Sequence, residues 1–295
     1  MLFANCSSNM RIDAHQHFWQ YDALRDGWIT DEMGVLRRDF LPEHLVPELV
    51  ANDMQGSIAV QADPSETETR FLLDLASRNE VIQGMVGWVD LCAANVHERL
   101  QLFSKYSKLC GFRHIVQAEL DDQFMLQPDF LRGIGCLEEF GFTYDILIYA
   151  RQLPAAIELA SRFPNQPFVV DHLAKPSIKA KRFLPWARHL RTLAENPNVY
   201  CKVSGLVTEA DWQRWGTDDF KPYLDLAFET FGVERLIFGS DWPVCLLAAS
   251  YRQVVQLIAD YTRDLSITDQ DKIFGLNAAH FYGQRAARHA TAIGK

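Results

Sequence analysis

The 295-residue sequence predicts a single-domain α/β fold, a (β/α)8 barrel, and three observations support it. Eight short apolar runs alternate with longer amphipathic stretches, which is typical of a parallel sheet covered by helices. No linker or low-complexity segment divides the chain, and its length is normal for one barrel. Ionisable side chains gather near one end of several runs, where barrels build their active sites. An open doubly wound sheet is the alternative, but no GxGxxG or Walker-type loop supports it.

The expected strands are brief, rich in β-branched and aromatic residues, and bounded by Gly, Pro or Asn. They lie at residues 11–18, 56–62, 81–89, 111–116, 142–148, 167–173, 199–206 and 235–242. Glycine opens or precedes four of them, at Gly56, Gly111, Gly141 and Gly232. Because glycine takes positive φ without strain, we expect helix-to-strand turns at these four positions.

Helical patterns fill most of the gaps between the strands. The clearest are at residues 67–78, 129–140, 153–163, 183–195 and 220–231, and two tail helices near 269–274 and 277–282 are expected to cover the barrel. The segment 19–44, between the first strand and the first helix, is unusually long. Such loops are usually functional or disordered, and its Trp19, Tyr21 and Trp28 favour an ordered loop over the mouth of the barrel.

Composition excludes several classes of partner. The net charge is −9 and no basic run offsets it, which argues against nucleic acid. No stretch approaches the roughly 18 apolar residues of a membrane span, and the N-terminus does not resemble a signal peptide. The six cysteines are far apart, which fits reduced thiols and a cytoplasmic location. We expect residues 1–10 to be an N-terminal extension and residues 11–295 to form the barrel with its C-terminal helices.

The first strand carries the sequence His15-Gln16-His17. Residues two apart on a strand share one face, so both imidazoles are expected to point into the barrel mouth. Two inward histidines at this spacing are a natural pair of metal ligands. The pair alone is a weak signal, because short histidine pairs also occur as core or surface groups.

Four further strands carry ionisable residues towards the same end. The last strand runs into Asp241, the sixth delivers His172, the fourth delivers Arg113 and His114, and the fifth holds Asp145. An ionised Asp is rarely buried without a partner. Packing explains any one of these residues, but it explains the whole set at one end of a barrel poorly. The set therefore predicts an active site.

Five motifs in order resemble the amidohydrolase superfamily, in its amidohydrolase family 2 branch. They are DAHQHFW (13–19), GFRH (111–114), VVDHLAKP (169–176), KVSGL (202–206) and GSDWP (239–243). Their order is similar to that of sugar lactonases of the L-fuconolactonase and L-rhamnonolactonase type. The resemblance spans residues 11 to about 284, and it is far more specific than the histidine pair alone.

The resemblance implies hydrolysis of an aldonolactone to the aldonic acid, with an L-fuconolactone-like compound as the first substrate to consider. Asp241 would be the base that activates water, while Arg113 and His172 would stabilise the carbonyl oxygen. The substrate-binding residues would be Trp19, Trp28, Gln61, Trp88, His114, Asp145, Lys175 and Trp242. Each tryptophan also has the simpler explanation of core packing.

The resemblance also implies a site for one divalent metal ion, zinc or manganese, on His15, His17 and Asp241, with His172 as a further candidate ligand. A binuclear centre is not expected, because the fourth strand offers an arginine in place of a bridging lysine and the fifth offers no histidine. A metal-independent mechanism stays open, because a lactone is an activated ester.

Two other functions remain alternatives. One is a metal-dependent non-oxidative decarboxylase of the same superfamily, against which the missing fifth-strand histidine and the HQHFW and DHLAKP segments argue. The other is a non-catalytic sugar-binding barrel, against which the intact Asp241 and histidine pair argue. The expected partner is thus a small-molecule sugar lactone, with no nucleic acid and no membrane. Whether the protein is a homo-oligomer is left open.

Overall fold

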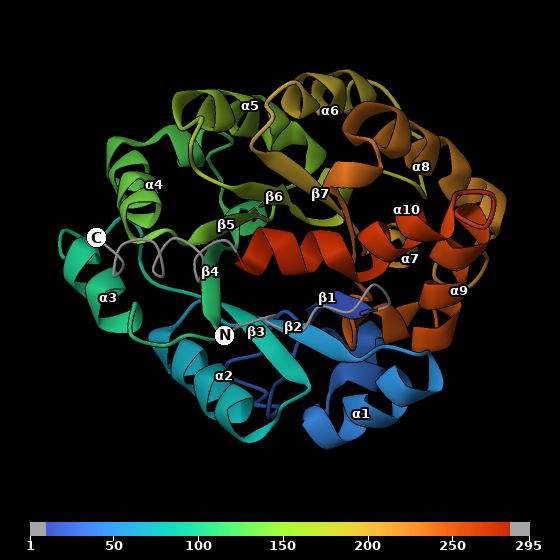
Figure 1. Cartoon of the computed structure of the whole chain (residues 1–295), viewed down its shortest axis with the longest axis horizontal. Coiled ribbons are helices and arrows are strands. Elements are labelled where there is room, and N and C mark those ends of the chain that lie inside the picture. The colour runs from blue at the N-terminus through green and yellow to red at the C-terminus, as the bar shows by residue number, and fades with distance from the viewer. Residues whose placement is uncertain (1–9, 284–295) are drawn as a thin grey trace.

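The computed structural model describes residues 10–283, which form a ring of eight parallel strands surrounded by helices (Figure 1). Each strand pairs with its sequence neighbours in the order β1 to β8. Their bounds are β1 Ile12–Gln16, β2 Gly56–Val60, β3 Ile82–Gly87, β4 Leu109–His114, β5 Thr143–Ile146, β6 Phe168–Val170, β7 Val199–Val203 and β8 Leu236–Phe238. All eight strands expected from the sequence are confirmed, and with them the barrel.

The barrel closes between the residues that follow β8 and those at the end of β1. The backbone N–H of Asp241 donates to the carbonyl of His15 over 2.8 Å, and that of His17 donates to the carbonyl of Trp242 over 2.7 Å. Gln16 and Trp242 form a parallel bridge. The seam of the barrel therefore runs through the candidate catalytic residues.

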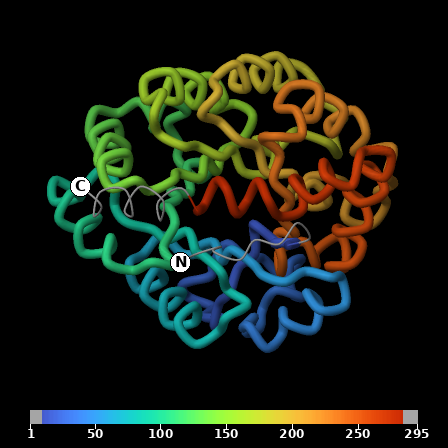
Figure 2. The backbone as a smooth tube through the Cα atoms, viewed as in Figure 1, coloured from blue at the N-terminus to red at the C-terminus, as the bar shows by residue number. Residues whose placement is uncertain are grey.

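The helices lie outside the strands, as the backbone trace also shows (Figure 2). The α-helices are α1 Pro42–Ala51, α2 Glu66–Arg78, α3 Val96–Phe103, α4 Pro128–Phe140, α5 Leu153–Arg162, α6 Trp186–Ala194, α7 Leu206–Glu209, α8 Thr217–Phe231, α9 Tyr251–Tyr261 and α10 Ile267–Asp271. Short 3-10 turns lie at η1 Asp31–Leu36, η2 Val116–Ala118, η3 Phe124–Leu126, η4 Ala150–Gln152, η5 Asp171–Ala174, η6 Val233–Arg235 and η7 Val244–Leu247, and a π-helix, η8, at Lys272–Leu276. The five clear helices expected from the sequence are confirmed. None of the helices within residues 10–283 is long and apolar enough to cross a membrane.

The C-terminal helical segment at residues 277–283 closes the amino end of the barrel. Phe281 and Tyr282 are buried against inward-facing residues such as Ile12 and Val169, and the ring of Phe281 lies 5.0 Å from that of Tyr200 of β7, tilted by 50°. In Figure 1 this red helix crosses the centre of the ring. The expectation that the tail covers the barrel is confirmed, and the opposite, carboxyl end is left open for a site.

Two of the four expected glycine turns are wrong. Gly141 and Gly232 do follow helices with φ of 70° and 64°. Gly56 and Gly111 instead lie within β2 and β4. At Gly111 a Cβ would lie 2.1 Å from Oγ1 of Thr143, so glycine is required there by the close approach of β5. Of the expected N-terminal extension at 1–10, all but Met10 lies outside the described residues.

Candidate active site

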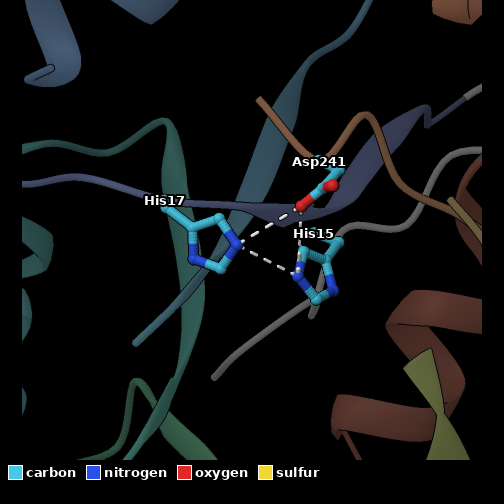
Figure 3. Close-up of side chains that lie close together, drawn as sticks. All are labelled: His15, His17 and Asp241. Atoms are coloured by element: carbon cyan, nitrogen blue, oxygen red, sulfur yellow. Dashed lines mark hydrogen bonds and ion pairs between the residues drawn. The ribbon is translucent and has the colours of Figure 1, made fainter. Parts of the chain in front are cut away.

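His15 and His17 project from the end of β1 into the barrel mouth, as their spacing predicts. Their Nε2 atoms lie 3.2 Å apart, and Oδ1 of Asp241 lies 3.8 Å from Nε2 of His15 and 3.4 Å from Nε2 of His17. The three side chains converge on one point (Figure 3). All three are buried, so their mutual charge is poorly screened by water.

The surroundings of each histidine set its orientation. Nδ1 of His17 donates to the carbonyl of Val60 over 2.8 Å, which leaves a lone pair at Nε2. Nδ1 of His15 lies 3.0 Å from Nζ of Lys202. Gly239 allows His15 to pack against the end of β8, because a Cβ there would lie only 2.5 Å from Cβ of His15.

Asp241 lies in a turn that hydrogen bonds of the preceding residue stabilise. Its φ is 59°, a left-handed conformation that costs free energy for a residue other than glycine. The preceding Ser240 donates from its N–H and its hydroxyl to Asp13, over 2.8 and 2.5 Å. Burial raises the pKa of Asp241, but His172, His17 and His15 outweigh this effect and keep it below its usual value. The carboxylate is therefore ionised at neutral pH.

His172 lies in a run of four left-handed residues, from His172 to Lys175, with φ between 48° and 56°. The sequence predicted strand as far as residue 173, but β6 ends at Val170, so that boundary is wrong. Nδ1 of His172 lies 2.8 Å from Oγ of Ser204, and its Nε2 lies 3.9 Å from Oδ1 of Asp241. Burial lowers the pKa of His172 to about 4, so this imidazole is neutral near pH 7.

A buried ionic network lies beneath the histidines. Nζ of Lys202 contacts Asp145 at 2.6 Å and Asp171 at 3.0 Å, and Nη1 of Arg113 contacts Asp171 at 3.1 Å. Burial raises the pKa of Asp171, but the Lys202 charge and then His15 outweigh it and hold that pKa well below its usual value. Tyr282 donates to Asp145 over 2.8 Å and so ties the C-terminal helix to the network. The network supplies the opposite charges that buried ions need.

A cavity of about 310 Å³ opens above these groups. His17, Arg113, His172 and Asp241 form part of its lining, and the loop after β1 contributes further wall residues, namely Trp19, Arg25, Asp26 and Trp28. The long loop therefore does lie over the mouth. The volume falls at the lower end of the range for small-molecule sites.

The eight expected substrate-binding residues separate into two groups. Trp19, Trp28 and Lys175 line the cavity. The other five lie outside its lining: Gln61, Trp88, His114, Asp145 and Trp242.

Each of these five residues has other contacts in the fold. Gln61 donates to the carbonyl of Arg113, and Asp145 is fully buried against Lys202. His114 binds Glu119 at 2.7 Å, Trp242 packs edge-on against Phe40, and Trp88 is half-buried beside α2. Strand-end position alone did not separate lining residues from supporting ones, because neighbouring residues on a strand point to opposite faces.

The sequence reasoning missed two kinds of residue. Asp171 and Lys202 both contact Nδ1 of His15, and their only signal was their place in the VVDHLAKP and KVSGL segments. Arg25, Asp63 and Gln117 line the cavity from loops. The position of Asp63 shortly after β2 was a usable signal, because barrel sites are built from the loops that follow strands.

The donor set His15–His17–Asp241 fits a single zinc ion. Zinc bonds of about 2.0–2.2 Å in tetrahedral geometry place ligand atoms roughly 3.3–3.6 Å apart, and the three observed separations are 3.2, 3.4 and 3.8 Å. His15, Asp171 and His172 form a second group within reach of one another. Asp171 is already bound by Arg113 and Lys202, so the first set is the better site.

The family model described as amidohydrolase matches residues 12–284. The chain belongs to the amidohydrolase family. This amidohydrolase is 43% identical over 284 residues to an L-fucono-1,5-lactonase of Burkholderia multivorans, covering 92% of this chain and 96% of the relative. It is 38% identical to an L-fucono-1,5-lactonase of Burkholderia ambifaria, covering 92% and 95% of the two chains.

A solved amidohydrolase structure from Burkholderia multivorans with bound zinc is 42% identical to this amidohydrolase. The match covers 93% of this chain and 99% of that chain, with a TM-score of 0.90. The similarity extends over the whole barrel.

Proposed function

We propose that this amidohydrolase hydrolyses a sugar lactone, opening an aldonolactone ring to the aldonic acid, with L-fucono-1,5-lactone as the first substrate to test. The named activity of the two Burkholderia relatives supports the choice of substrate. The observation that carries the chemistry is the ionised Asp241 beside two histidines on the wall of a cavity. A carboxylate in this position can take a proton from water.

Asp241 acts as the general base. Water adds to the lactone carbonyl carbon while its proton passes to the Asp241 carboxylate, and a tetrahedral intermediate forms. The ring C–O bond then breaks, and the leaving alkoxide takes a proton from the Asp241 carboxyl. The water oxygen stays on the carbonyl carbon, and Asp241 returns to its ionised form. Loss of such a base costs about 10²–10⁴-fold in rate.

Arg113 and His172 stabilise the negative charge that develops on the carbonyl oxygen. Both line the cavity, and the neutral His172 can present an Nε2–H when its Nδ1 accepts from Ser204. A well-placed donor of this kind contributes about 3–4 kcal/mol to the transition state. Lys175 faces the cavity for sugar hydroxyls, while Trp19 and Trp28 offer apolar faces for the ring.

His15, His17 and Asp241 would hold one zinc ion, and when bound it would supply Lewis-acid polarisation and acidify a water molecule. Oδ1 of Asp171 lies 3.4 Å from Nδ1 of His15, where it can accept the proton of that nitrogen and leave Nε2 available for the metal. Second partners of metal-ligating histidines set ring orientation and basicity. Manganese is a poorer fit, because it favours oxygen-rich sites and this donor set has two nitrogens.

The test is acid release from a panel of aldonolactones, followed with a pH indicator. The wild-type protein is expected to hydrolyse one or more of them, and Asp241→Asn to lower kcat/KM by at least about 10²-fold. The matched control is Asp218→Asn, because Asp218 lies exposed in the first turn of α8. An Asp241→Asn variant with wild-type turnover would exclude Asp241 as the base. No acid release from any lactone by the wild-type protein would remove the proposed function.

A further inference from the structure

Asp63 lies on the wall of the catalytic cavity, yet the proposed mechanism gives it no part. It follows β2 in the short segment before α2, and it also lines a second groove beside the cavity. This groove measures about 390 Å³ and shares Arg25 and Asp63 with the catalytic cavity. Asp63 therefore stands at the junction of the two spaces, where a bound ligand can reach it.

The other carboxylates on the cavity wall are already engaged. Asp26 accepts from Nε and Nη2 of Arg25 at 2.8 Å each, and from the N–H of Asp22 at 2.8 Å. Asp241 faces the histidines. Within residues 10–283, by contrast, the Asp63 carboxylate has no hydrogen-bond or ion-pair partner. It is the wall carboxylate that is free to accept new hydrogen bonds.

The positively charged side chains of the cavity wall are also paired. Nζ of Lys175 lies 3.4 Å from Glu209, and Arg113 is paired with Asp171. Arg25 holds Asp26 and also donates to the carbonyl of Gln20. Among the described residues, the wall therefore has no unpaired Lys or Arg to attract an anionic substrate, whereas it has an unpaired acceptor. Such a wall suits an uncharged ligand that is rich in hydroxyl groups.

The backbone holds Asp63 in a defined place. Its carbonyl accepts from the N–H of Ser65 over 2.9 Å, and Oγ of Ser65 in turn caps α2 by accepting from the N–H of Glu68. Because the backbone of Asp63 is fixed between a strand and a capped helix, binding a ligand has to order only its short side chain. Hydrogen bonds accepted by a carboxylate in such a place can therefore discriminate between substrates.

We propose that Asp63 is a specificity-determining residue, whose carboxylate accepts hydrogen bonds from hydroxyl groups of the lactone. This role rests on the proposed lactone hydrolysis. A carboxylate offers acceptor sites on both oxygens, so it can bind two neighbouring hydroxyls of one ring. Hydrogen bonds to a charged group are stronger than neutral ones. Asp63 thus favours polyhydroxylated lactones over lactones without hydroxyls.

The experiment compares two lactones that have the same ring size. One is a six-membered aldonolactone, L-fucono-1,5-lactone, and the other is δ-valerolactone, which lacks hydroxyls. We expect Asp63→Ala to lower kcat/KM for the aldonolactone by about 10- to 100-fold, the range for loss of a hydrogen bond to a charged group. The value for δ-valerolactone should change by less than about twofold. Asp63→Asn, which keeps one acceptor oxygen, should recover part of the loss.

Asp218→Ala is the matched control, since it removes an exposed carboxylate far from the cavity lining. It should leave both substrates at wild-type rates. Equal losses on both lactones in Asp63→Ala, or no loss on either, would overturn the role of Asp63 while leaving lactone hydrolysis intact. Failure of the wild-type protein to hydrolyse any aldonolactone would overturn the proposed function and this role together.

Discussion

Nε2 of His15 and Nε2 of His17 face each other across 3.2 Å in the mouth of the barrel. The carbonyl of Val60 accepts a hydrogen bond from Nδ1–H of His17, so the lone pair on Nε2 of His17 points at His15 and Asp241. Two ring nitrogens and a carboxylate in such close contact are stable only when a proton or a cation lies between them. A metal ion bound by these three atoms would supply that cation.

Removal of one histidine should weaken zinc binding. We expect His17→Ala to lower zinc affinity by at least about 100-fold, because the loss of a direct ligand should exceed the 10- to 100-fold effects of outer partners. Equilibrium dialysis against a chromophoric chelator measures this without reference to activity. His97→Ala is the control, since His97 is exposed and pairs with Glu139. Equal zinc affinity in wild type and His17→Ala would place the metal elsewhere.

Lys202 is expected to be essential for stability as well as for the site. Its side chain is fully buried between Asp145 and Asp171, so Lys202→Met leaves Asp145 without a cation and Asp171 with Arg113 alone. Breaking a buried pair in this way costs about 3–5 kcal/mol. Urea unfolding of Lys202→Met should show this loss in the free energy of unfolding.

The control Lys221→Met removes an exposed pair with Asp225 and should change the free energy of unfolding by less than about 1 kcal/mol. A Lys202→Met variant as stable as Lys221→Met would contradict the network.

Gly239 is expected to control the position of His15. A Cβ at this position would lie 2.5 Å from Cβ and 3.1 Å from the backbone nitrogen of His15, so Gly239→Ala must push β1 away from the end of β8. Displacement of catalytic groups by about 1 Å can cost roughly 10²-fold in rate. Gly135→Ala, inside α4, meets only Phe163 at 3.7 Å and should stabilise the protein by about 0.5–1 kcal/mol. Wild-type turnover in Gly239→Ala would contradict the prediction, because it would show that a Cβ at residue 239 does not displace His15.

The sequence predicted those parts of the molecule that obey short-range periodicity. Alternation within the first strand placed His15 and His17 together, and the rule that barrel sites form at the carboxyl ends of strands added Asp241 and His172. These four residues do converge in the structure. Each of them follows from its own strand, so no knowledge of distant contacts was needed.

The remainder of the site depends on contacts that no local pattern encodes. Asp145 was expected to bind substrate, but its partners Lys202 and Tyr282 lie 57 and 137 positions further along the chain. The left-handed run at His172 to Lys175 is a conformation that its residue types do not favour. It is held by burial and by the hydrogen bond of Trp186 to the carbonyl of Leu173. Tertiary structure decides such positions.

Glu68 should make the stability of the protein depend on pH. Burial raises its pKa from 4.5 to about 7, an effect that the N–H of Ala62 only partly opposes. The folded chain therefore binds the proton more tightly than the unfolded chain, so stability falls as pH rises from about 4.5 to 7. Glu68→Gln keeps an acceptor for Ala62 without the charge. In urea unfolding, the free energy of unfolding of this variant should exceed that of the wild type by about 1–3 kcal/mol at pH 8. Near pH 4.5 the two values should be equal. Glu98→Gln, at an exposed position, should show no such trend, and a Glu68→Gln variant no more stable than wild type at pH 8 would refute the argument.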